Sequence, residues 1–287
     1  MAKTSTRVQI TNRFAALSPQ QLSLVLGGAL LILFLVRTAW CAEDAYIGFR
    51  VVDNCLHGQG LTWNVGERVQ VYTDPLFELL MIAGTWISGS SYWTSMVVSL
   101  LLSISAYVFL VSERTATAIL LGTTLLLTSK GFMDFSVSGL ENPATHLAVA
   151  AYAWVYWRKR NPFWLALIAS LAMVNRMDSI LLFAPSLVWL YCREGSRVLK
   201  PVLLGLTPFL AWEAFAVFYY GFPFPNTAYA KLNTGIPASA AAQQGIHYLR
   251  NAVSWDTVTA LAIVAGIAAG LISADWPLAL GAMLSVG

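Results

Sequence analysis

Two adjacent carboxylates follow the first apolar run of the sequence, and of all its residues they are the best suited to chemistry. Glu43 and Asp44 come shortly after the run that ends at Ala39. Neighbouring carboxylates at a helix end near a membrane surface repel each other and lose hydration, which suits one of them to act as a general base. The pair could equally cap a helix or bind Arg50. The residue types alone leave these interpretations open.

A loop with two closely spaced glycines and a proline step follows. His57 precedes the glycines, whose spacing is typical of tight turns. Further along, Thr73 and Asp74 stand directly before Pro75, a residue suited to the first turn of a helix. We therefore predict a helix from Pro75, capped by Thr73 or Asp74.

Two cations lie in polar segments between apolar runs. Arg176 stands two residues before Asp178, and Lys231 follows a Pro-rich stretch. Ionisable residues at membrane depth are costly and indicate a functional site. Both could clamp a phosphate at the level of the lipid headgroups. Alternatively, Arg176 pairs with Asp178, and Lys231 extends its charged end to the membrane surface.

The elements that must position these residues are membrane helices. The 287 residues are 57% hydrophobic and 11% charged, whereas a soluble domain carries about a quarter charged residues. The composition thus predicts an all-α polytopic membrane protein without a separate soluble domain. We expect spans at 22–39, 94–111, 115–129, 144–157, 162–174, 179–192, 201–220 and 255–273. The first is preceded by basic residues but lacks a small-residue cleavage site after it, so we interpret it as an uncleaved helix.

A ninth apolar run begins near Trp276, and the sequence ends inside it. We therefore expect residues 1–287 to form a single transmembrane domain that is truncated at its C-terminus.

Charge decides how the chain crosses the membrane. If Pro75–Ser88 does not cross, Arg114, the basic cluster at 158–160 and the basic residues at 193–200 all lie on the cytoplasmic side with the N-terminus, as the positive-inside rule requires. We therefore predict a juxtamembrane or re-entrant helix at 75–88 within a first extracytoplasmic loop of residues 40–93. Most acidic residues then fall outside, in or beside the segments 40–74, 130–143, 175–178 and 221–254.

Several function classes are excluded or disfavoured. A net charge of +3, spread along the chain, is too small for a nucleic-acid partner. The three cysteines lack metal-ligand spacing, although Cys41 and Cys55 fall in one predicted loop and could pair in an oxidising compartment. No phosphate-cradling Rossmann pattern is present, so a nucleotide-sugar donor is not indicated.

The order of these motifs resembles that of the AftB-type arabinofuranosyltransferases, which are membrane enzymes of the GT-C architecture. The resemblance extends from about residue 20 to 235. It rests on the run from Glu43 to Arg50, the stretch from Gly58 to Leu76, Ser138-Gly139-Leu140-Glu141, Arg176 with Asp178, and Pro225-Asn226-Thr227 with Tyr229-Ala230-Lys231. In that family the paired aspartates of the first loop contain the presumed catalytic base. Here Asp44 matches the second aspartate, Glu43 replaces the first, and Asp74-Pro75 stands where relatives have His-Pro.

The resemblance implies a GT-C-type helix bundle with extracytoplasmic juxtamembrane helices, in the plasma membrane of a bacterium. It implies transfer of D-arabinofuranose from a polyprenyl-phosphate donor to an extracytoplasmic glycan acceptor. We expect Asp44, supported by Glu43, to orient or deprotonate the acceptor hydroxyl, while Arg176 and Lys231 meet the donor phosphate. Further substrate contacts are expected from Tyr46, His57, Tyr72, Glu141, Asp178 and Asn226. No protein metal ligands are predicted, and a divalent cation is compatible with the motifs.

Two other functions stay open at the level of sequence. One is a different polyprenyl-phosphosugar transferase that modifies a protein such as a pilin. The other is a non-catalytic transporter of the lipid-linked sugar. Transporters tend to place ionisable groups near the bilayer midplane and to show internal repeats, and this sequence shows only Glu213 within a predicted span.

Overall fold

The chain folds as a bundle of helices in the computed structural model, which describes residues 17–112, 114–232, 235–273 and 275–286. The helices are α2 (Pro19–Thr38), α3 (Ala45–Leu56), α4 (Pro75–Ser88), α5 (Ser91–Val111), α6 (Ala116–Thr128), α7 (Lys130–Phe135), α8 (Asn142–Arg158), α9 (Pro162–Asn175), α10 (Ile180–Glu194), α11 (Leu199–Gly205), α12 (Thr207–Tyr220), α13 (Asn226–Leu232), α14 (Ala238–Trp255), α15 (Thr257–Ile272) and α16 (Trp276–Val286), with 3-10 turns η1 (Met177–Ser179) and η2 (Gly195–Val198). The described residues include no strand. The predicted all-α class is confirmed.

The surface of the bundle is suited to lipid. Among the described residues, α2 and α5 are each long and apolar enough to cross a membrane, and two bent helix pairs would raise the number of spans to four. Large apolar side chains face outward, with Phe218 86% exposed, and α15 buries none of its residues. Outward apolar surface on this scale is expected where hydrocarbon replaces water as solvent. The protein is a polytopic membrane protein.

Each predicted span corresponds to a helix, with shifts of a few residues at the ends. The segment 201–220 differs because it is divided into α11 and α12. Pro208 lies in the first turn of α12, and it lacks the N–H that a continuous helix would use. The stretch Met177–Gly205 is bent by 52° against Thr207–Tyr220.

Four helices were not expected from the sequence. Helix α3 lies inside the first loop, α7 lies in the polar segment 130–143, and α13 and α14 lie in the segment 221–254, which was interpreted as a polar connection. Helix α3 is amphipathic and buries Val51 and Val52 on one side, while α14 buries no residue. A search for long apolar runs overlooks such helices, since only one face is apolar. The predicted helix at 75–88 is confirmed as α4. Cys41 and Cys55 are free, so the pairing considered above is not formed.

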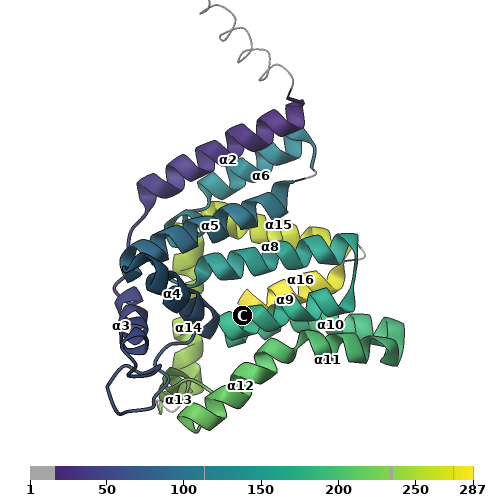
Figure 1. Ribbon diagram of the computed structural model, residues 1–287. Helices are drawn as coiled ribbons and strands as arrows, with labels where there is room; N and C mark the ends of the chain where they lie inside the picture. The colour runs from purple at the N-terminus through teal and green to yellow at the C-terminus, as the bar shows by residue number, and fades with distance from the viewer. Residues whose placement is uncertain (1–16, 113, 233–234, 274, 287) are drawn as a thin grey trace, which may run out of the picture.

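The polar segments between the spans gather at one end of the bundle. Figure 1 shows α3, α4, α13 and α14 together at the left, beside the ends of the stacked helices. Backbone hydrogen bonds join these segments across the sequence. The Trp40 and Ala42 amides donate to the Val137 and Ser138 carbonyls, and the Asn226 amide donates to the Gln70 carbonyl, at 2.9–3.1 Å. The polar segments therefore form one layer.

Close helix contacts below this layer depend on small side chains. Helix α5 packs extensively on α8 and buries Ser95, Ser99 and Ser103 completely. Helix α11 approaches α9 at Gly205, where a Cβ atom would lie 2.7 Å from both the Ala166 Cβ and the Phe163 carbonyl oxygen. Small residues allow such approaches within membranes.

We predict that Gly205→Ala destabilises the bundle, because the added methyl group would force α11 away from α9. Overpacking of this kind costs about 1–3 kcal/mol. The apparent melting temperature in detergent should fall. Gly266→Ala on α15 is the matched control, since a Cβ there meets no atom within 4 Å. Equal melting temperatures for the two variants would contradict the predicted contact.

Candidate active site

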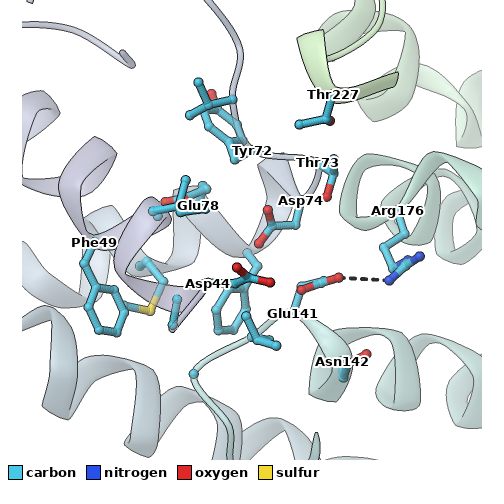
Figure 2. A pocket seen from close by; sticks show the side chains of 18 of the residues that line it. Asp44, Phe49, Tyr72, Thr73, Asp74, Glu78, Glu141, Asn142, Arg176 and Thr227 are labelled. Atoms are coloured by element: carbon cyan, nitrogen blue, oxygen red, sulfur yellow. Dashed lines mark hydrogen bonds and ion pairs between the residues drawn. The ribbon is translucent and has the colours of Figure 1, made fainter. Parts of the chain in front are cut away.

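A cavity of about 830 Å³ lies where the polar segments meet. Its walls come from the start of α3, the start of α4 with the residues before it, the turn before α8, and single residues from the end of α9, from α13 and from α14. Its acidic lining residues are Asp44, Asp74, Glu78 and Glu141. Arg176 is the basic residue in the same lining. Figure 2 shows the Asp44, Asp74 and Glu141 carboxylates directed toward the same space.

The first loop presents Asp44 to the cavity and leaves Glu43 outside. Ala42 is held by its backbone bond to Ser138, so the chain turns into α3 at Asp44. Asp44 is the N-cap residue of α3, but its side chain makes no capping hydrogen bond. The Asp44 carboxylate is therefore free to serve the cavity. Glu43 is exposed and does not line it.

Asp74 lies at the start of α4 and does not use its carboxylate as a helix cap, contrary to one of the sequence interpretations. Its side chain points into the cavity instead (Figure 2). Burial, with a smaller contribution from the nearby Glu141 carboxylate, raises the pKa of Asp74 to about 7, against smaller lowering effects of backbone hydrogen bonds and of Arg176. Near neutral pH, Asp74 can therefore either hold or release a proton.

Glu78 follows one helical turn later, on the same face of α4. Its side chain is 3% exposed, and the buried Oε2 atom has no hydrogen-bond partner. Burial, with a smaller contribution from Asp74, raises the pKa of Glu78 well above its ordinary value. Gly48 of α3 makes room for it, because a Cβ there would collide with Glu78 Oε1. Burial thus favours the uncharged form of Glu78 in the cavity wall.

Arg176 is held at the end of α9 by two carboxylates. Its guanidinium lies 3.1 Å from Glu141 Oε1 and 2.9 Å from Asp178 Oδ2, and a further bond of 3.2 Å to Asp178 makes that contact bidentate. The Asn175 side-chain amide donates to the Glu141 carbonyl at 3.2 Å and to Thr145 Oγ1 at 3.0 Å. The structure therefore contains the Arg176–Asp178 pair that the sequence offered as the alternative to phosphate binding. Arg176 keeps 43% of its side chain exposed.

Tyr72 contributes its ring to the cavity wall. Its hydroxyl is engaged with the Tyr220 hydroxyl at 2.7 Å, and Tyr220 in turn donates to the Leu61 carbonyl at 2.9 Å. Burial raises the pKa of Tyr72. Tyr72 therefore braces the first loop against α12 and offers mainly its ring to a ligand.

Four of the predicted substrate contacts do not line this cavity. Tyr46 is 57% exposed and packs edge-on against Phe49 at a centroid distance of 5.2 Å. His57 lies 3.3 Å from the Asp53 carboxylate on the surface. Asn226 and Asp178 line two neighbouring cavities. Lys231 lies in α13, and its side chain falls outside the part of the chain that the structure describes.

Asp74 and Glu78 were not predicted as site residues. Asp74 was interpreted as a helix cap, and Glu78 as part of the polar face of an amphipathic helix. The available signal was their spacing. Two carboxyl groups four residues apart lie on one face of a helix, and α4 is otherwise strongly apolar. Among the described residues, no group of three or more His, Cys, Asp or Glu side chains is arranged to hold a metal ion.

Comparison with known proteins identifies two curated relatives, which share the same name. The chain is similar to terminal β-(1→2)-arabinofuranosyltransferases. It is 28% identical over 239 residues to the Mycobacterium tuberculosis protein of that name, with 74% of this chain and 37% of the relative covered. It is 24% identical over 236 residues to the Corynebacterium glutamicum protein, with 67% and 33% covered. The chain thus spans about a third of the length of the relatives it matches. No family model and no solved structure matches it.

We predict that Asp74 makes stability depend on pH. Its folded pKa of about 7 lies above the ordinary value of 3.8, so the folded state holds this proton more tightly than the unfolded state between these pH values. Stability should therefore fall as pH rises from about 4 through about 7. Asp74→Asn, which mimics the protonated form, should raise the apparent melting temperature at pH 8 by at least about 2 °C and change it little at pH 4.

The matched control is Glu43→Gln, which changes an exposed carboxylate outside the cavity and should show no such difference between pH 4 and pH 8. An Asp74→Asn protein that loses as much stability as the parent between these pH values would show that Asp74 is ionised throughout.

Proposed function

We propose that this chain forms the membrane part of a glycosyltransferase that moves arabinofuranose from a polyprenyl-phosphate donor to a glycan acceptor. The observation that carries the proposal is the convergence of Asp44, Glu141 and Arg176 in one cavity. These residues belong to three of the motifs on which the resemblance to AftB-type enzymes rests. The two curated relatives are both named arabinofuranosyltransferases, which supports arabinofuranose as the sugar.

Asp44 is the residue we propose as the base. Its carboxylate reaches the cavity without a capping bond, so it is available to take the proton of an acceptor hydroxyl. In the transfer, that hydroxyl oxygen forms a bond to the anomeric carbon of the donor sugar. The bond from the anomeric carbon to the phosphate oxygen breaks, and the lipid phosphate leaves with the electron pair. Glu43 is exposed beside Asp44 and has no proposed contact with substrate.

Arg176 is the residue we propose for the leaving phosphate. It borders the main cavity and a second cavity, and its guanidinium stabilises negative charge as it develops on the departing oxygen. Both Glu141 and Asp178 already neutralise this cation. Phosphate binding therefore requires that one carboxylate, most simply the more exposed Asp178, gives up its contact.

The neutral state of buried carboxyl groups makes room for an anionic donor. Four carboxylates and one guanidinium would repel a phosphate if all were ionised. The raised pKa values of Asp74 and Glu78 remove much of that charge near neutral pH. In their protonated forms the same groups can donate hydrogen bonds to a sugar or phosphate oxygen.

We place the reaction at the extracytoplasmic face of a bacterial plasma membrane, on a GT-C-type scaffold. The positive-inside rule supports this side, because the layer that contains the cavity lies opposite the cluster at 158–160 along α8 and α9. The isoprenoid tail of the donor would remain in the membrane beside the bundle. We propose that residues 1–287 belong to one transmembrane domain.

We predict that Asp44→Asn in the intact protein lowers the transfer rate about 100-fold or more, as expected for loss of a general base. Donor binding should stay within about threefold, since the amide keeps the size of the carboxylate. Glu43→Gln is the matched control, and it should retain the parental rate. Full activity of Asp44→Asn together with loss in Glu43→Gln would move the base to Glu43.

We further predict that the donor sugar is arabinofuranose. Membranes that contain the intact protein should transfer radiolabel from polyprenyl-phosphate arabinofuranose to a glycan acceptor, and should transfer little from the mannose or glucose analogues. Transfer of mannose or glucose to protein, without arabinose transfer, would support the alternative of a protein-modifying enzyme. Donor binding without any transfer would support the transporter.

A further inference from the structure

A second cavity, of about 440 Å³, also borders Arg176, and Asp44 does not line it. It shares Thr73, Arg176 and Thr227 with the main cavity, so the two are neighbours across one wall. Its remaining walls come from α9, α12 and the Pro-rich stretch before α13. The assignments above use this cavity only at Arg176 and its partner Asp178.

Three buried oxygen atoms in the lining of this cavity have no hydrogen-bond partner among the residues that the structure describes. They are Gln70 Oε1, Glu213 Oε1 and Thr227 Oγ1. Gln70 is oriented by its own amide, which donates to the Tyr72 carbonyl at 3.2 Å, so its free atom is the oxygen. Buried polar atoms without partners are costly in a folded protein. Their presence together in one cavity indicates a ligand that supplies the missing hydrogen bonds.

The chemistry of these atoms narrows the ligand class. An amide oxygen and a carboxylate oxygen accept hydrogen bonds and cannot donate them. A fully ionised phosphate offers no hydrogen to these atoms, whereas neutral hydroxyl groups can satisfy all three. Glu213 also lies in apolar α12, where an ionisable side chain needs a functional reason.

Aromatic rings complete the second cavity and extend it. Trp212 and Phe224 line it, and Gln70 and Phe224 also border a third cavity of about 260 Å³. Arg68, Asn226 and Tyr229 line that third cavity. Hydroxyl-binding polar groups among aromatic side chains fix an amphiphilic ring in place, and sugar residues have this character.

We propose that the second and third cavities form a cleft for successive neutral sugar residues of the glycan acceptor, beyond the residue that reacts at Asp44. The proposal rests on the proposed function, which places the reacting end of the glycan at Asp44. It assigns Glu213, Gln70 and Phe224 as glycan contacts. The cleft makes a longer glycan bind more tightly than a single sugar.

The test compares a methyl arabinofuranoside with a linear arabinofuranosyl tetrasaccharide, both without donor, on the intact protein in nanodiscs by calorimetry. We expect the parent to prefer the tetrasaccharide. Glu213→Leu and Phe224→Ala should each weaken tetrasaccharide binding about tenfold, which corresponds to one lost hydrogen bond or ring contact. Monosaccharide affinity and the KM for the lipid donor should stay unchanged. Phe218→Ala on α12 is the control, since Phe218 faces away from all three cavities.

The outcomes separate this inference from the proposed function. Loss of tetrasaccharide affinity in the variants, in a parent that transfers no arabinose, supports the cleft and contradicts the proposed reaction. Normal transfer with unchanged tetrasaccharide affinity in both variants overturns the cleft alone. A parent without preference for the tetrasaccharide also overturns it. A raised KM for the lipid donor with unchanged glycan affinity assigns the second cavity to the donor and overturns the proposal. Phe224 is exposed and borders both cavities. Phe224→Ala therefore keeps the test valid if Glu213→Leu fails to fold.

Discussion

The pairing of Arg176 with Glu141 joins the end of α9 to the start of α8, and the rest of the polar layer depends on it. These two helices run antiparallel and contribute to one hydrophobic cluster. The start of α8 and the end of α9 must therefore meet without leaving backbone groups or charges unpaired. Asn175 bonds the Glu141 carbonyl and Thr145, while Arg176 neutralises the Glu141 carboxylate. An ionic contact that loses one partner leaves the other charge poorly solvated. This junction therefore fixes both the fold of the layer and the position of the cation in the cavity.

The two loops that complete the cavity are attached to this junction indirectly. The first loop is bound to the turn before α8 through the backbone bonds from Trp40 and Ala42, which brings Asp44 to the same side as Glu141. Tyr72 and Tyr220 then tie the second half of the loop to α12. Residues separated by more than a hundred positions are thus placed by ordinary hydrogen bonds, and the carboxylates at the centre remain available for ligands. The capping role that Asp74 could take is left unused, and the side chain serves the cavity.

Much of this arrangement could be predicted from the sequence, because apolar runs and basic clusters report directly on membrane helices. Helices at the predicted spans, the helix at 75–88 and the gathering of the polar segments at one end agree with the structure, although two to four of these helices are long and apolar enough to cross a membrane. Helices α3 and α14 could not be predicted from apolar runs, since their apolar faces are narrow. Asp44, Tyr72, Glu141 and Arg176 line one cavity, whereas Tyr46 and His57 lie on its outside. Which face of a short loop turns inward depends on tertiary bonds such as Ala42 to Ser138, which no local pattern encodes.

The same cavity holds carboxyl groups in different environments, and this difference gives the acidic cluster a physical meaning. Glu78 lies between α3 and α4, and its burial favours the protonated form. Asp44 stands at the exposed entrance to α3, where water and an incoming hydroxyl can reach it. Carboxyl groups whose environments separate their proton affinities can take different roles in one reaction. A buried carboxyl group that favours its protonated form and an accessible carboxylate in one cavity can therefore divide the work, the first donating a hydrogen bond and the second accepting a proton.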